Sequence, residues 1–185
     1  MFDFETINNV QNKILVLSQE KDKSVFLHQA VETIAETLNI YFVGIYLASE
    51  NRDFVFLEAG SGEFGESLLK YVHKIKISES GIFCEQAGAA VYLNEIRLTI
   101  LETGKISAWQ VSAGGISKIK IRKDIELFVG SPMFASSLIE LFLPLQVNGK
   151  AIGVLQITLD ELLEFSENQI LSLQKIANEI AIQLA

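Results

Sequence analysis

The sequence has few of the residues on which several classes of protein depend. It contains a single cysteine, Cys84, two histidines and two prolines. An intramolecular disulfide and a cysteine-rich zinc site are therefore excluded. Walker phosphate loops, dinucleotide-binding glycine fingerprints and Gly-x-Ser-x-Gly nucleophile turns do not occur in it. We therefore predict a protein that is not an enzyme and that has no catalytic residue, no metal site and no cofactor.

The charge and hydrophobicity of the chain narrow its class further. Its 23 acidic and 15 basic residues give a net charge of −8, which disfavours binding to nucleic acid or to an anionic membrane. It has no run of about 18 apolar residues, the length of a membrane-spanning helix. The first residues are acidic, unlike a signal peptide, so we expect a cytoplasmic protein. A hydrophobic content of 49% in 185 residues is enough for one core.

Two amphipathic helices are predicted at the N-terminus. The first has an apolar stripe at three- and four-residue spacings and ends at the polar run 18–23. The second runs from an N-cap at Ser24 to about Asn39. Their stripes are Ile7, Val10, Ile14 and Leu17, followed by Leu27, Val31, Ile34 and Leu38. The first helix also carries Phe4, Leu15 and Val16, more apolar surface than one buried face needs, which indicates a partner helix.

Strand signals follow the helices. Tyr41–Leu47 and Phe54–Ala59 are β-branched and aromatic runs around a polar turn, which predicts a hairpin. We predict a short helix near 66–70 and then a third strand over Val72–Ile77, with one face exposed to solvent.

The middle of the chain has weaker signals. We predict a short buried helix within Ser78–Ala90 and a brief strand Val91–Leu93. The segment from Asn94 to about Gly115 gives no firm assignment, although Arg97–Glu102 is compatible with a helix. Ile116–Lys123 alternates apolar and basic residues, as an exposed edge strand does. A loop follows at 130–134.

The C-terminal third has the clearest pattern. Leu141–Val147 and Ala151–Leu159 are apolar runs joined by Asn148-Gly149, a strong hairpin signal. The second run is apolar on both faces, so we expect a central strand. A capping box of Ser166 and Gln169 begins the terminal helix. The order of elements predicts an α+β fold with helices on one face of an antiparallel sheet.

Several of these segments together resemble the GAF domain, a sensory module of signalling proteins such as two-component kinases and response regulators. The best match is the block 140–158, an apolar strand with Pro144-Leu145, a turn with glycine, and then Ile152-Gly153-Val154-Leu155. Tyr41–Leu47 and the start of the terminal helix at Phe165 also match. The resemblance implies a GAF-like central antiparallel sheet with N- and C-terminal helices packed on one face and loops or short helices covering a pocket on the other. It divides the chain into an N-terminal dimerisation-type helix over 1–23 and a GAF-like domain over 24–185.

The implied pocket would be lined by aromatic side chains and few polar groups. The candidates are His73, Phe83, Tyr92, Trp109, Phe134 and Phe142. The alternative is that these side chains only pack in the core.

The known chemistries of GAF proteins find little support in the residues. GAF domains that attach a bilin covalently carry a Cys followed by a His. In this sequence Cys84 is followed by Glu85. A sulfoxide reductase of this fold needs a second thiol to resolve a sulfenic acid, and the chain has one. The signature of cyclic-nucleotide binding is absent at Thr158–Asp160 and at Gln169–Ile170. His28 and His73 lie on separate elements, so they indicate no metal site.

The resemblance implies a non-catalytic, small-molecule-sensing or regulatory module in bacterial signal transduction of the two-component type. An unknown small-molecule ligand would act on the terminal helices, which in GAF proteins commonly pair across a two-fold axis, so we expect a homodimer. The alternatives are a small redox enzyme on the same fold and a pure dimerisation adaptor without ligand.

Overall fold

A computed structural model describes residues 3–79, 86–101, 103, 105–112, 115–120 and 138–185. Its helices are α1 (Phe4–Leu17), α2 (Lys23–Leu38), α3 (Gly62–Lys70), α4 (Gln86–Leu93) and α5 (Glu167–Leu184). Its strands are β1 (Phe42–Ala48), β2 (Phe54–Gly60), β3 (Lys74–Lys76), β4 (Glu95–Ile100), β5 (Lys105–Ser112), β6 (Gly115–Ile119), β7 (Ile139–Val147) and β8 (Lys150–Leu159).

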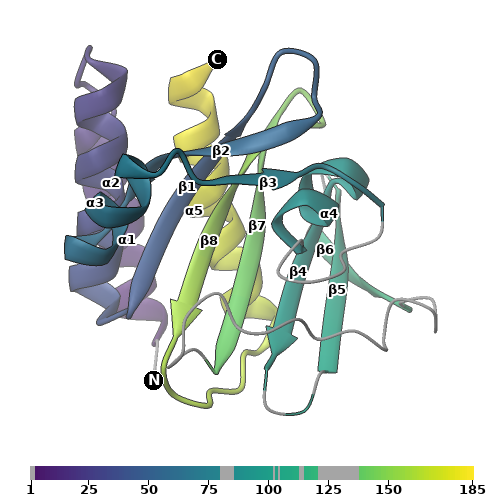
Figure 1. The fold of residues 1–185 in the computed structure, drawn as a ribbon. Helices are drawn as coiled ribbons and strands as arrows, with labels where there is room; N and C mark the ends of the chain where they lie inside the picture. The colour runs from purple at the N-terminus through teal and green to yellow at the C-terminus, as the bar shows by residue number, and fades with distance from the viewer. Residues whose placement is uncertain (1–2, 80–85, 102, 104, 113–114, 121–137) are drawn as a thin grey trace.

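The strands form one antiparallel sheet with helices on both faces (Figure 1). The strand order is β3-β2-β1-β8-β7-β4-β5-β6. On one face α2 packs on β1 and β2, α5 packs on β7 and β8, and α1 lies against α2 and α5. On the other face α3 packs on β1 and β2, and α4 packs on β4, β7 and β8. The predicted α+β fold, with the terminal helices on one face of an antiparallel sheet, is confirmed.

The two N-terminal helices are confirmed, with one correction at a cap. Ile7, Val10 and Ile14 are fully buried on α1, as their spacing predicts. The N-cap of α2 is Asp22 and not Ser24, because the Asp22 carboxylate accepts hydrogen bonds from the backbone N–H groups of Ser24 and Val25 at 2.9 and 3.2 Å. A carboxylate also interacts favourably with the helix dipole at this end.

The two predicted hairpins are confirmed, and β8 is central between β1 and β7. Asn148 and Gly149 both have positive φ, 51° and 74°, as a tight two-residue turn requires. Gly153 permits the close pairing of β8 with β1, because a Cβ atom there would lie 2.2 Å from the carbonyl oxygen of Tyr46. Pro144 lies on β7 opposite Val154 of β8 and beyond the residues that pair with β4, so its missing N–H breaks no bond between β7 and β4.

Two expectations for the middle of the chain were wrong, and a third element is shorter than predicted. Val91–Leu93 ends α4 and forms no strand. The helix considered for Arg97–Glu102 is not present over residues 97–100, which belong to β4, where Ile96, Leu98 and Ile100 alternate with polar residues at the period of a strand. The predicted third strand is shorter, limited to Lys74–Lys76.

Other predictions for the middle segment stand or lie outside the described residues. The exposed edge strand is confirmed as β6 up to Ile119. Residues 80–85 of the predicted buried helix and the predicted loop at 130–134 are not among the residues that the structure describes.

Candidate functional site

The sheet face opposite α1, α2 and α5 carries an unusual set of buried polar side chains. Residues that pair directly across antiparallel strands share a face of the sheet. One such row crosses β1, β8, β7, β4 and β5 and consists of Gly44, Gln156, Phe142, Arg97 and Ala108. The neighbouring row consists of Phe42, Thr158, Glu140, Thr99 and Ile106.

These two rows lie under α4. Phe42 and Phe142 belong to the same buried cluster as Ala87, Ala90 and Val91 of that helix. We call the five polar residues of the two rows the polar floor. Each is at most 4% exposed: Arg97, Thr99, Glu140, Gln156 and Thr158.

Arg97 of the floor forms an ion pair with Glu95, which lies beside the floor and is partly buried. Nη2 of Arg97 donates to Oε2 of Glu95, two residues earlier on the same strand. The side chain of Arg97 is 3% exposed and that of Glu95 is 14% exposed. Glu140 adds a second carboxylate in the adjacent row, where it pairs across the strands with Thr99 and Thr158.

Several atoms of the floor have hydrogen-bonding capacity that the described protein groups do not use. Among the described residues, none bonds to Nε or Nη1 of Arg97, to Oγ1 of Thr99 or to Oε1 of Gln156. The amide nitrogen of Gln156, in contrast, donates to Oγ1 of Thr158 at 3.1 Å. Leaving a buried donor or acceptor unsatisfied costs about 1–3 kcal/mol, so a cluster of such atoms calls for a bound complement.

Tyr46 and His73 form a second polar contact on this side of the sheet. The Tyr46 hydroxyl lies 3.3 Å from Nδ1 of His73, and the rings meet edge to face with centroids 5.8 Å apart. Burial raises the pKa of Tyr46, and the charge of Glu140 raises it further. Partial burial lowers the pKa of His73. Both groups are therefore neutral at pH 7, and the contact is a hydrogen bond between uncharged rings.

The structure brings together only part of the predicted aromatic pocket. His73 contacts Tyr46, which shares a buried cluster with Phe142. Trp109 pairs with Ile96 and lies in the core between the sheet and the layer of α1, α2 and α5. It therefore lies on the opposite face of the sheet from Phe142. Tyr92 is 57% exposed on α4. Phe83 and Phe134 lie outside the described residues.

Sequence reasoning missed the residues of the polar floor. β8 looked apolar on both faces, although Gln156 and Thr158 alternate with Leu155, Ile157 and Leu159. That alternation was the available signal. Arg97 was missed because its segment carries no clear signal for a strand.

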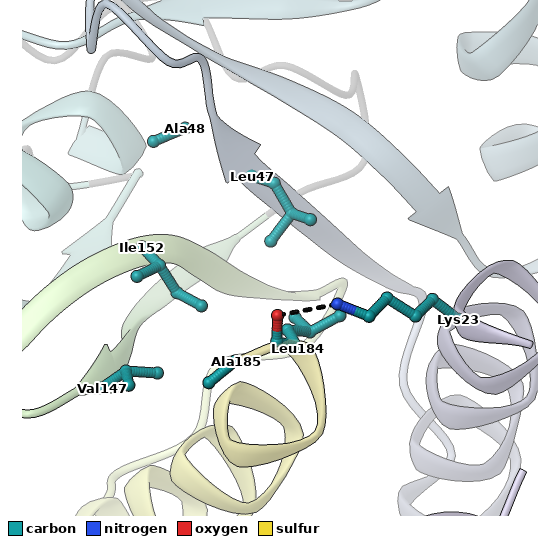
Figure 2. A pocket seen from close by; sticks show the side chains of 7 residues that line it. All are labelled: Lys23, Leu47, Ala48, Val147, Ile152, Leu184 and Ala185. Carbon is teal, nitrogen blue, oxygen red and sulfur yellow. Dashed lines mark hydrogen bonds between the residues drawn. The ribbon is translucent and has the colours of Figure 1, made fainter. Parts of the chain in front are cut away.

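Two further hollows lie on the side of the sheet that α1, α2 and α5 cover. One, of about 430 Å³, opens where the C-terminal end of α5 approaches the edge of β1, β7 and β8 (Figure 2). Leu47, Val147 and Ile152 give it an apolar wall, and Nζ of Lys23 donates to the carbonyl oxygen of Leu184 at 3.0 Å across its rim. The other, of about 350 Å³, lies between α1 and α2 beside Val16 and Thr33. Neither contains a cluster of buried polar groups comparable to the floor.

The described part of the chain contains no group of three or more His, Cys, Asp or Glu side chains that could hold a metal ion. None of its helices is long and apolar enough to cross a membrane. The floor itself consists of one guanidinium, one carboxylate, one amide and two hydroxyls. Such groups bind and orient a molecule by hydrogen bonds and charge.

Comparisons with known proteins agree on the fold. No protein-family model matches the sequence, and no curated protein matches it either. Solved structures do. A GAF domain of a phosphoenolpyruvate-protein phosphotransferase from Acinetobacter has a TM-score of 0.69 at 17% identity, over 99% of this chain and 94% of that one.

Two more similar structures differ in what they bind. The phycoerythrobilin-bound GAF domain of a cyanobacterial phytochrome has a TM-score of 0.68 at 15% identity, over 97% of this chain and 94% of that one. A free methionine-R-sulfoxide reductase from Neisseria meningitidis, in complex with its substrate, has a TM-score of 0.69 at 18% identity, over 99% and 92%. The chain therefore has the fold of a GAF domain, a fold found in both sensory modules and enzymes.

Proposed function

We propose that this chain is a non-catalytic sensory or regulatory module whose small-molecule ligand binds over the polar floor. The observation that carries the proposal is the set of buried atoms on Arg97, Thr99 and Gln156 that no described group satisfies. A soluble ligand that supplied their hydrogen bonds would remove this cost and favour the bound state.

One strand, β7, connects a ligand on the floor to the terminal helix α5. On β7, Glu140 and Phe142 lie on the sheet face of the polar floor, whereas Leu141 and Leu143 lie on the opposite face, in the core under α1, α2 and α5. α5 packs on the same strand. A ligand that shifts β7 therefore shifts the surface on which α5 rests, which is how binding would bias an output.

We place the module in bacterial signal transduction of the two-component type, in the cytoplasm, as a homodimer paired through its terminal helices. The likeness to GAF domains of a phytochrome and a phosphotransferase supports a signalling role. Support for the dimer comes from apolar side chains that stay exposed on the terminal helices, namely Phe4, Leu15 and Val16 on α1 and Ile182 on α5.

A small redox enzyme is the second candidate, because structures of methionine sulfoxide reductases share the fold. Reduction of a sulfoxide by a cysteine passes through a sulfenic acid, which a second thiol resolves. Cys84 is the only cysteine of the chain, so an enzyme of this kind would depend on an external thiol. A dimerisation adaptor is the third candidate.

Native mass spectrometry of the purified protein, followed by denaturation and analysis of what is released, tests the proposal. A stoichiometric small molecule supports a sensor. Dimers that carry no molecule favour an adaptor. Turnover of free methionine sulfoxide with dithiothreitol as reductant, abolished in C84S, would instead establish an enzyme.

A further inference from the structure

We infer that α4 is a lid over the polar floor and that the side chain of Asn94 is the latch that holds this lid closed. The inference rests on the proposed function, since it concerns how a molecule reaches the same site. Each floor residue is at most 4% exposed, so a molecule from solution does not contact these side chains in the closed structure. A part of the protein that covers the floor has to move before a ligand binds.

Helix α4 packs on β4, β7 and β8 on the face of the sheet that carries the floor (Figure 1). Phe142 and Val154 of that face belong to one buried cluster with Ala90 and Val91 of α4. Phe142 is also the centre of one row of the floor. Movement of α4 away from the sheet therefore removes the cover of that row.

The side chains of α4 hold it to the sheet with little apolar surface. The helix has eight residues, and residues 87–90 are alanine, glycine, alanine and alanine. On the other face of the sheet, α2 buries Phe26, Leu27, Val31, Ile34 and Leu38. Apolar stabilisation grows with the area that is buried. Elements with little of it open locally at a lower free energy than the whole domain unfolds.

Asn94 joins α4 directly to β4 and is bound by its side chain to a different part of the chain. It lies between the last residue of α4 and the first of β4 and has φ 56°, in the left-handed region. Its Nδ2 donates to the carbonyl oxygen of Gly149 at 3.1 Å, and its Oδ1 accepts from Nε2 of Gln146 at 2.7 Å. Both atoms of the amide are therefore bound to the β7–β8 hairpin.

The other half of α4 contacts β3 through the backbone. A Cβ atom at Gly88 would lie 1.9 Å from the carbonyl oxygen of Lys76, so the two backbones meet closely. Dispersion attraction of this kind is lost over a small increase in distance. Element-terminal residues often act as hinges, and Asn94 has this position. Release of its amide from the hairpin frees α4 to turn about residue 94 and to separate from β3.

Thiol labelling of the full chain measures the opening. V154C in a C84S background places a single thiol under α4, because Val154 is fully buried in the cluster that includes this helix. A177C in the same background is the reference, because Ala177 is fully buried on α5 in the core of the opposite face. At low concentrations of N-ethylmaleimide, reclosing outruns the reaction, and the rate reports the population of the open form.

Without further changes, V154C should react faster than A177C and with a weaker dependence on urea. The reason is that a local opening exposes less surface than global unfolding, and the effect of urea scales with that surface. Labelling of V154C with the same rate and urea dependence as A177C would show that this face opens only when the whole chain unfolds. That result would overturn the lid.

N94G tests the latch, because glycine keeps the left-handed conformation and removes the amide. The matched control is N39G, the same change at Asn39, an exposed residue with φ 52° that ends α2. We expect N94G to raise the labelling rate of V154C at least tenfold, since the opening no longer breaks two hydrogen bonds, and N39G to leave it unchanged.

Two results would overturn the latch. An unchanged rate for V154C in N94G would mean that the Asn94 bonds persist in the open form, and an equal increase in N39G would mean that the effect is not specific to Asn94. The proposed function is decided separately, by the molecule that native mass spectrometry finds, because the labelling experiments contain no ligand.

Discussion

Pro144 on β7 and Gln174 on α5 are joined by a hydrogen bond, in which Nε2 of Gln174 donates to the carbonyl oxygen of Pro144 at 2.8 Å. Gln174 is 1% exposed, so the contact is sheltered from water. Pro144 follows Phe142 by two residues on the strand that also carries Glu140 of the floor. The bond therefore fixes α5 to the end of the strand on which the ligand would rest.

Replacement of Gln174 by leucine should loosen this link. The change keeps the size of the side chain but leaves the Pro144 carbonyl without its donor, at a cost of about 1–3 kcal/mol. Urea denaturation measures it as a lower midpoint with an unchanged slope. The matched control is Q29L at an exposed position of α2. Equal midpoints for Q174L and the wild type would show that the bond contributes nothing.

The ion pair of the floor should be far more sensitive to loss of one partner than of both. R97M leaves the partly buried carboxylate of Glu95 without its partner. Removal of one partner of a fully buried pair costs about 3–5 kcal/mol, so the cost here should lie at or below that range. E95Q/R97M, which removes both charges, should cost clearly less. Chemical unfolding of R97M, E95Q and the double variant forms a double-mutant cycle. Additive effects of the two single changes would contradict a direct interaction.

Local signals in the sequence were sufficient for the terminal helices and the two hairpins but not for β4 or for the site. Asn148-Gly149 and the capping box of Ser166 and Gln169 specify a turn and a helix start within a few residues, and both are confirmed. The polar floor is different. Arg97 and Gln156 lie in one row across the sheet only because of the register in which β4, β7 and β8 pair. Pairings between strands far apart in the chain depend on tertiary packing, which propensity does not encode.

The face on which a side chain lies is also a tertiary property. The size and aromatic character of Trp109 suggested a pocket residue, but its pairing with Ile96 places it in the core under α1, α2 and α5. A shift of one residue in the register of β5 would have reversed its face.

His73 should make the stability of the protein depend on pH below neutrality. Burial lowers its pKa in the folded state below the ordinary value of 6.5, so the unfolded chain binds the proton more readily. The contribution of neutral His73 is fully present above pH 6.5 and is lost as the pH falls from 6.5 through the lower folded pKa. Protonation also removes the acceptor that Nδ1 can offer to the Tyr46 hydroxyl.

The measurement is the urea midpoint of the wild type, H73Q and H28Q between pH 5 and 8. H28Q is the matched control, because His28 is exposed on α2. We expect H73Q to flatten the decline below pH 6.5 and H28Q to retain it. The same decline in H73Q as in the wild type would assign the pH dependence to other groups.

The exposed apolar face of α1 should pair with a second copy of the chain. Val16 is 72% exposed, and Leu15 beside it is 43% exposed. V16E places a charge on this face, where burial in a dimer would desolvate it at a cost of several kcal/mol. Sedimentation velocity should show a dimer for the wild type and a monomer for V16E. Y92E is the matched control, because Tyr92 is an exposed apolar residue on α4, on the opposite face of the sheet, and it should remain dimeric. A wild type that stays monomeric at every concentration would refute pairing through the terminal helices, and loss of the dimer in Y92E alone would move the interface to the face that carries the polar floor.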